Sequence, residues 1–137
     1  MTTWELEKLI VHLINGEWFE QAYPVLPRKF PQWVEKPLSE SPYLLALKHK
    51  DKKIFRDYSA ILRQRKDAAP EGIFREPMTY EEFVDLYEDV KRNGIKDTST
   101  MWVGENYIVG DGHHRLAILL HLGEKTITLP DKIKNEN

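Results

Sequence analysis

The sequence predicts an α+β fold, in which helices pack on a small mixed sheet and an N-terminal helical extension precedes it. Two observations support the sheet-containing part: short strand-like segments alternate with helical segments after Gly72, and both helical segments have clear start and stop signals. A third observation, apolar residues at helical spacing near the N-terminus, supports the extension. We expect the extension over residues 1–70, the sheet-containing part over 71–130 and a polar tail over 131–137, all within one composite domain.

The composition limits the classes of function. The 137 residues suffice for one core, and the chain carries 41% hydrophobic and 31% charged residues with a net charge of −2. A protein that coats nucleic acid usually has a basic excess, which is absent here. The absence of cysteine excludes disulfides, thiolate metal sites and thiol catalysis. No apolar run suits a membrane span, and Glu5 and Glu7 are unlike a secretion signal, so we expect a cytoplasmic protein with no membrane partner.

Residues 3–14 are expected to form an amphipathic helix, capped by Thr2 or Thr3 and ended by Asn15-Gly16. Its apolar positions are Trp4, Leu6, Leu9, Ile10, Leu13 and Ile14.

Residues 22–42 contain five prolines interleaved with aromatic residues, which excludes a long helix. We expect an irregular strap over the core, with the wall of a ligand pocket as the alternative.

Residues 42–66 are expected to form two helical pieces broken near Lys50-Asp51, with Pro42 in the first turn after Ser41 or Ser39. Eight cations face only two acids over this stretch, and we call them the Lys48–Lys66 face. It is either a solvated surface or, in an otherwise acidic chain, a contact for nucleic acid. Its cations are Lys48, Lys50, Lys52, Lys53, Arg56, Arg63, Arg65 and Lys66.

After a connector at 68–72, the elements follow closely. Ile73-Phe74 is expected to be a short strand, and Thr79 with Glu82 forms a capping box that opens a helix over 80–93. An extended segment over 95–103 leads to a turn at 104–106 and a strand at 107–109. A helix over 113–122, ended by Gly123, and a strand over 126–129 complete the pattern.

The turn from Gly110 to Arg115 carries the chemistry. A helix start exposes amides and the positive end of the helix dipole, and Gly110 and Gly112 would let a ligand approach the backbone. Arg115, His113 and His114 can supply positive charge to a phosphate. Asp111 can hold a divalent metal or orient a hydroxyl. The structural alternative is that Asp111 caps the helix while the histidines pack or face solvent.

Three segments carry a resemblance to a known family. YEEFVDLYEDVKRNGI (80–95), YIVGDGHHRLA (107–117) and Gly123 followed by TITLP (126–130) resemble, in order and spacing, the ParB/sulfiredoxin superfamily. The resemblance spans Gly72 to Pro130, and the first 70 residues match nothing in it. It implies a ParB/sulfiredoxin-like fold with a nucleotide-phosphate site at Gly110, Gly112, His113, His114 and Arg115.

Members of this superfamily use the turn differently. ParB proteins bind CTP there and grip DNA, sulfiredoxins bind ATP, and related free-serine kinases transfer phosphate from a nucleotide. Sulfiredoxin-type members carry a reactive cysteine at the position of His113, so that chemistry is excluded here. With only a short tail after the last strand, we expect no helix-turn-helix domain of the ParB type.

The Asp-Gly-His-x-Arg form of the turn is similar to the kinase-like members, in which the Asp and an upstream Glu assist transfer. The resemblance therefore implies catalytic roles for Asp111, His113 and Glu76, with Glu71 as the second choice for the glutamate. ATP or another nucleotide would be the cofactor, with Mg²⁺ on Asp111. We expect a phosphotransferase (kinase) acting on a small hydroxylated acceptor. The alternative is a non-enzymatic nucleotide-sensing or DNA-associated module, with nucleic acid on the Lys48–Lys66 face, and a nuclease is the third choice.

Overall fold

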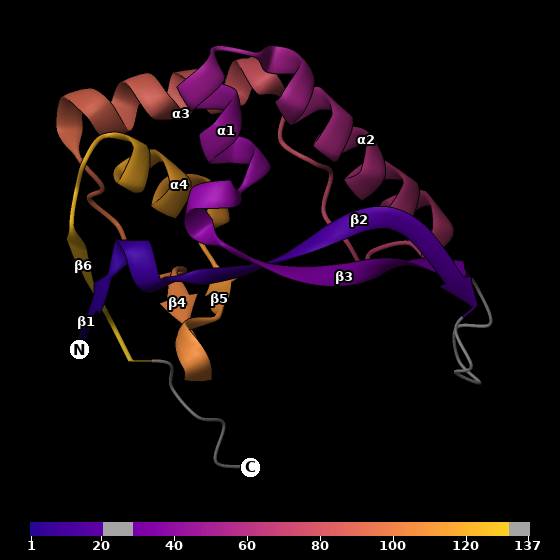
Figure 1. Cartoon of the computed structure of the whole chain (residues 1–137), viewed down its shortest axis with the longest axis horizontal. Coiled ribbons are helices and arrows are strands. Elements are labelled where there is room, and N and C mark those ends of the chain that lie inside the picture. The colour runs from indigo at the N-terminus through magenta and orange to yellow at the C-terminus, as the bar shows by residue number, and fades with distance from the viewer. Residues whose placement is uncertain (21–28, 132–137) are drawn as a thin grey trace.

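A computed structural model of the chain describes residues 1–20 and 29–131. Within these ranges four helices lie above a set of short strand pairs (Figure 1). The helices are α1 (Pro42–His49), α2 (Lys52–Ala68), α3 (Tyr80–Asn93) and α4 (His113–His121). The strands are β1 (Thr2–Glu5), β2 (Ile10–Glu20), β3 (Lys29–Pro37), β4 (Trp102–Val103), β5 (Val109–Asp111) and β6 (Thr126–Leu129). Three 3-10 turns are η1 (Leu6–Lys8), η2 (Leu38–Glu40) and η3 (Glu105–Tyr107).

The strands form three antiparallel pairs, β1 with β6, β2 with β3 and β4 with β5. The chain is therefore a small protein of mixed helix and strand, as its sequence predicts. A single mixed sheet is not formed in the described part, where the three pairs are separate sheets. An isolated parallel bridge between Ile10 of β2 and Ile108, just before β5, links only two of these pairs.

The helix predicted over residues 3–14 is wrong. The segment folds as β1, η1 and the start of β2, and Asn15-Gly16 lies inside β2, where the register against β3 shifts. Its apolar spacing fits either structure, because Leu6 and Leu9 are buried from the 3-10 turn and its edge, while Val11 and Ile14 are buried from a strand. Pairing with β6 and β3 decides between the two, and neither partner is local in sequence.

The proline-rich segment is more regular than an irregular strap. Residues 29–37 form β3, which pairs with β2 along a long two-stranded ribbon. Prolines fit β3 because its other edge bonds to no strand in the described part, so no ladder amide is missed there. The first part of the predicted strap, 22–28, lies outside the described residues, as does most of the predicted tail at 131–137.

The two-piece helix over residues 42–66 is confirmed. Ser41 caps α1 by accepting the amide of Tyr43, with Pro42 in the first turn. Lys50 then adopts a left-handed conformation (φ 52°), and Asp51 caps α2 by accepting the amide of Lys53 at 2.9 Å. The break lies where the sequence predicts it.

The second half is close to its prediction, with two differences. The capping box of Thr79 and Glu82 opens α3, which ends before Gly94, and β6 is also confirmed. Ile73-Phe74 forms no strand, and the strand predicted at 107–109 is displaced, because η3 occupies 105–107 and β5 covers Val109–Asp111.

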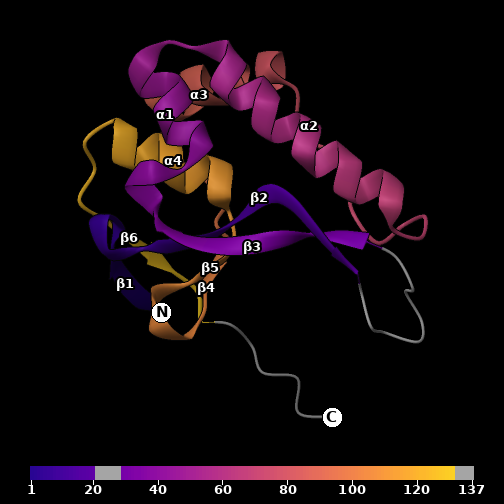
Figure 2. The same ribbon diagram turned by 45° about the vertical axis from the view of Figure 1, so that its right-hand side comes forward.

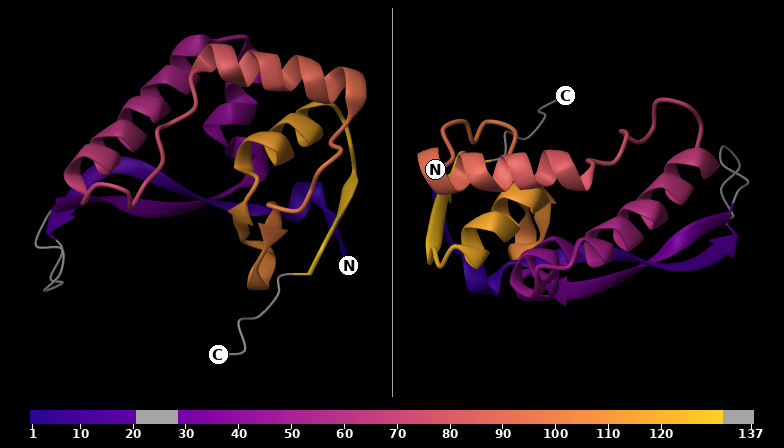
Figure 3. Two further views of the ribbon diagram at one scale, coloured as in Figure 1. Left: turned by 180° about the vertical axis from the view of Figure 1, so that it is seen from behind. Right: turned by 90° about the horizontal axis from the view of Figure 1, so that it is seen from above.

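One hydrophobic core joins residues from both halves of the chain. Its fully buried members include Leu6 and Leu9 from the first half and Leu116 and Leu129 from the second. Figures 2 and 3 show α4 between the other helices and the strand pairs, and α2 running along the β2–β3 ribbon. Described side chains from the first half of the chain, such as Leu6 and Leu9, are thus packed into the same core as Leu116 of α4.

None of the helices in residues 1–20 and 29–131 combines the length and the apolar character that crossing a bilayer requires.

Removing a side chain from the N-terminal part of this core should destabilise the whole protein. Leu9 is completely buried, so Leu9→Ala should lower the free energy of unfolding by about 2–5 kcal/mol, measured by urea denaturation. Ile73 is 56% exposed, and Ile73→Ala is the matched control, with an expected change of about 0.5 kcal/mol or less. Equal effects of the two substitutions would contradict the packing described above.

Candidate functional site

The turn between β5 and α4 has an unusual helix start. Gly112 adopts a left-handed conformation (φ 102°) at the N-cap position and contributes no side-chain cap. The first helical bond runs from the amide of Leu116 to the carbonyl of Gly112 at 2.9 Å. The amides of residues 113–115 therefore have no acceptor within the helix, and they lie at the positive end of its dipole.

Asp111 lies directly before this helix start and is half-buried. Its Oδ1 accepts a hydrogen bond from the amide of Gly112 at 2.8 Å. The carboxylate is thereby held beside the first turn of α4. The structural alternative, in which Asp111 caps the helix, is thus partly met. The hydrogen bond, however, comes from the amide of Gly112, the N-cap residue, and not from an amide of the first helical turn.

His113 is half-buried at the first position of α4. Burial lowers the pKa of its imidazole, the Asp111 carboxylate opposes this shift, and His12 lowers the pKa further. The ring is therefore neutral at neutral pH, with one nitrogen able to donate a hydrogen bond and the other able to accept one.

His114 turns into the protein and packs among aromatic rings. Its ring centroid lies 4.2 Å from that of Tyr43, 5.9 Å from Phe83 and 6.5 Å from Phe55. Burial, assisted by repulsion from His113, lowers the pKa of His114 to about 4. The expectation that this side chain charges near neutral pH is wrong, because the charged form would have to be desolvated. The ring of His114 therefore brings no positive charge to a phosphate at neutral pH.

The two glycines have different roles. Among Gly110 and Gly112, only Gly112 has a positive φ. A side chain at Gly110 would lie 2.2 Å from ring atoms of Trp102, so this glycine makes room for the indole. The indole covers the side of Gly110 that a ligand was expected to approach. At Gly112 a Cβ would lie 3.0 Å from Cγ of Met101, so Met101 packs closely beneath the turn.

Arg115 links the turn to the segment before β4. Its Nη1 donates a hydrogen bond to the carbonyl oxygen of Asp97 at 3.0 Å. The guanidinium is half-buried and has further donors beyond this one. Arg115 therefore remains able to contact an anion at the helix start.

Glu76 is engaged elsewhere. Its carboxylate forms ion pairs with Arg63 and, at 3.6 Å, with Lys66, both on α2. The hydrogen bond from Arg63 is the main cause that lowers the pKa of Glu76. In the described part, the ion pairs and hydrogen bonds of Glu76 are thus to α2 and not to the turn. Glu71, the second candidate for the catalytic glutamate, is exposed. The structure brings together Asp111, Gly112, His113 and Arg115, and it does not add a glutamate from the 71–76 segment by any described contact.

Two residues that the sequence does not indicate, His12 and Glu35, lie at the end of the β2–β3 ribbon that is nearer to the turn. The bridge between Ile10 and Ile108 places β2 beside the segment that leads into β5, and His12 interacts electrostatically with His113. Nε2 of His12 lies 3.1 Å from Oε1 of Glu35 on β3. Sequence reasoning missed His12 because it predicted a helix over 3–14. Only as part of strand β2 does this segment lie beside Ile108, just before the turn.

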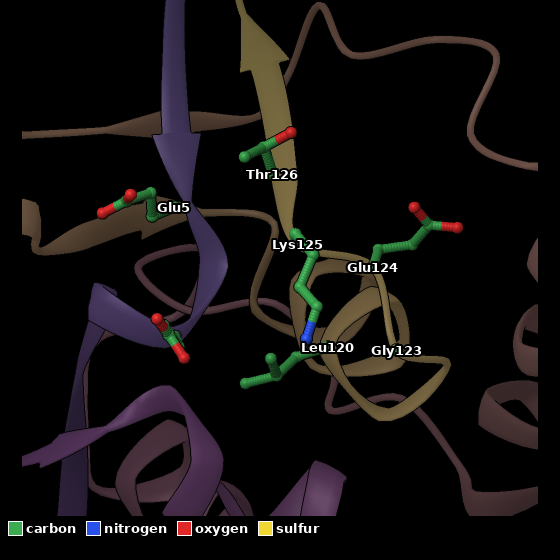
Figure 4. Close-up of a pocket in the computed structure, with 7 residues that line it drawn as sticks. Glu5, Leu120, Gly123, Glu124, Lys125 and Thr126 are labelled. Atoms are coloured by element: carbon green, nitrogen blue, oxygen red, sulfur yellow. The ribbon is translucent and has the colours of Figure 1, made fainter.

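A cavity of about 290 Å³ lies at the opposite end of α4 (Figure 4). Its lining is mostly charged and comes from β1, η1 and the region around the end of α4: Glu5, Glu7, Leu120, Gly123, Glu124, Lys125 and Thr126. None of the residues predicted for the phosphate site lines this cavity.

The buried state of His114 makes stability depend on pH in a defined direction. The pKa of His114 is about 4 in the folded protein and near 6.5 when exposed. As the pH falls, His114 is therefore protonated in the unfolded state at a higher pH than in the folded state. The free energy of unfolding should therefore fall as pH decreases from about 6.5 to about 4, with His113 adding to the same trend. His114→Phe keeps a ring in place and should reduce this slope between pH 7 and 5.

Urea denaturation at several pH values measures the slope. His49→Gln is the matched control, because His49 is exposed at the end of α1, and it should keep the wild-type slope. A His114→Phe variant with the full wild-type slope would show that His114 is not the group responsible.

No family model matches the chain, and neither a curated protein nor a solved structure matches it.

Proposed function

We propose that the chain binds the phosphates of a nucleotide at the start of α4 and transfers phosphate to a small hydroxylated acceptor. The observation that carries the proposal is the start of α4 at Gly112, which has no side-chain cap and leaves three successive amides without a helical acceptor. The resemblance of the surrounding segments to nucleotide-binding ParB/sulfiredoxin-like domains supports the same location.

The residues at the turn suit a phosphate. Backbone amides and the helix dipole favour an anion, and Arg115 adds a fixed positive charge on the same turn. His113 can donate a hydrogen bond from its neutral ring. The Asp111 carboxylate repels a phosphate, so a counter-ion between the two is needed.

Magnesium suits that need. Mg²⁺ is usually held by one or two carboxylates together with the phosphates of a nucleotide, so Asp111 alone is a sufficient protein ligand. The described residues contain no group of three His, Asp or Glu side chains arranged to hold a metal by themselves. We therefore expect Mg²⁺ to bind together with the nucleotide and not before it. In the complex, the ion would neutralise part of the charge on the phosphates.

The chain's own groups supply the acid–base chemistry. His113 is neutral at neutral pH, so it can take a proton from an acceptor hydroxyl, and Asp111 stands beside it to stabilise the charged ring. Glu76 has no part in this proposal, because its ion pairs hold it to α2.

The nucleic-acid alternative has less support. Five cations of the Lys48–Lys66 face already have partners in the protein. Lys53 pairs with Asp57, Arg56 with Glu81, and Arg63 and Lys66 with Glu76, while Arg65 lies over the ring of Phe74. These contacts reduce the positive charge free to meet a phosphate backbone.

A thermal-shift panel tests binding directly. ATP, ADP, CTP and GTP are added with and without Mg²⁺, and a ligand that binds the folded state raises the midpoint of unfolding. A screen of ATP or ADP with pooled amino acids, sugars and nucleosides then detects acceptor-dependent consumption. No shift with any nucleotide would reject the proposed site, and binding without consumption would leave a sensing module.

Arg115→Ala should abolish the nucleotide-induced shift. The substitution removes a charge-assisted contact to phosphate together with the bond to Asp97, so the free protein should lose about 1 kcal/mol of stability. Arg92→Ala, at an exposed position near the end of α3, is the control and should keep the shift. An unchanged nucleotide affinity in Arg115→Ala would mean that the guanidinium only tethers the segment at Asp97.

Asp111→Asn separates catalysis from binding. The amide oxygen of Asn can still accept the bond from Gly112, so the turn and its nucleotide affinity should be kept. Turnover with the acceptor found in the screen should fall by on the order of a hundredfold or more, because the carboxylate that stabilises the protonated ring of His113 is lost and acid–base catalysis of this scale depends on it. Wild-type turnover in Asp111→Asn would show that this carboxylate is not catalytic.

A further inference from the structure

Trp33 on β3 has an exposed ring in a defined position. The side chain is 54% exposed, which is unusual for the largest apolar residue. The guanidinium of Arg65 on α2 lies over the indole, 5.8 Å from the ring centroid, and also 4.0 Å from the ring centroid of Phe74. A cation against one face holds the ring in orientation without covering it.

The ribbon connects Trp33 to the turn before α4. His12 pairs with Glu35 and Ile14 with Trp33 across the strands, and alternate residues of a strand share a face. His12, Glu35 and Trp33 are thus on one face of the ribbon, and the rings of His12 and Trp33 make an edge contact at 6.3 Å. The bridge between Ile10 and Ile108 places one end of the ribbon beside the segment that leads into β5, and along the ribbon the pair of His12 and Glu35 comes between that end and the indole.

We propose that Trp33 stacks on the base of the nucleotide whose phosphates bind at the start of α4, an inference that rests on the function proposed above. In a nucleotide, the sugar separates the base from the phosphates, so the two ends need two binding regions. The start of α4 offers amides and Arg115, which suit only the phosphates. The ribbon offers an apolar ring, which suits only the base.

The side chains along the ribbon fit the remaining part of the ligand. His12 and Glu35 come between the Ile10–Ile108 bridge and Trp33 along the ribbon and can form hydrogen bonds to the hydroxyls of a sugar. Stacking on an indole depends little on the identity of the base, because every base has a flat aromatic face. Affinity for ATP, GTP and CTP should therefore depend on Trp33 alike.

The experiment compares ATP with inorganic triphosphate, which has no base. Affinities of the whole protein for both ligands, in the presence of Mg²⁺, are measured by calorimetry. Trp33→Leu should weaken ATP binding by about tenfold or more, the scale expected for loss of one stacked base, while triphosphate affinity stays at the wild-type value. Trp33→Phe keeps an aromatic face and should retain most of the ATP affinity.

Tyr107→Leu is the matched control, because Tyr107 is an exposed aromatic residue on η3. It should leave both affinities unchanged.

The outcomes distinguish the two proposals. Two outcomes would overturn the inference while wild type still binds triphosphate: Trp33→Leu keeps its ATP affinity, or it loses affinity for ATP and for triphosphate equally. In both cases the base does not stack on Trp33, and the proposed phosphate site is not contradicted. If wild type binds neither ligand, the proposed function fails and this inference fails with it. If Trp33→Leu abolishes self-association of the protein while ATP affinity is unchanged, the exposed indole is an interface between copies, which also overturns the inference.

Discussion

The contact between the rings of His114 and Tyr43 is the interaction on which the candidate site depends. The two ring centroids are 4.2 Å apart, and Phe55 and Phe83 pack around them, so this one histidine joins α4 to the other three helices. Successive residues of a helix point about 100° apart. Once His114 is directed into the aromatic cluster, His113 and Arg115 are directed away from it on either side. A charged ring could not occupy this place without losing its hydration, so the cluster also holds the imidazole neutral.

The site is assembled from segments that are distant in the sequence. In the binding site that we propose, the turn before α4 contributes Asp111, Gly112, His113 and Arg115, and the β2–β3 ribbon contributes His12, Glu35 and Trp33. The ribbon reaches the turn through the bridge between Ile10 and Ile108 and is held along α2 by the bond from the amide of Ile14 to the hydroxyl of Tyr58, at 3.2 Å. In this proposal, the residues that would bind the phosphates and those that would bind the rest of a nucleotide belong to different structural elements, so substitutions on one element need not affect the other.

The features that the sequence predicts well are decided within a few residues. The capping box of Thr79 and Glu82 and the break at Lys50-Asp51 are examples, because their hydrogen bonds join near neighbours. The helix predicted over 3–14 fails because Thr2–Glu5 pairs with Thr126–Leu129, a partner that no local pattern reveals. The location of the turn is predictable from its glycines and charges. The burial of His114 is not, since it depends on rings from three other helices, and His12 is found only when its segment is placed as a strand.

The pairing of β1 with β6 has a consequence for how the protein is made. β1 is synthesised long before its partner, Thr126–Leu129, because almost all of the described fold lies between them in the sequence. Until then the neighbouring Leu6 and Leu9, which are completely buried in the finished fold, lack part of the core that covers them. Contacts between such distant segments form slowly, because a long loop must close before they gain any energy. The nascent chain therefore keeps this apolar surface exposed until Thr126–Leu129 has been made, and a chaperone could bind it in that interval.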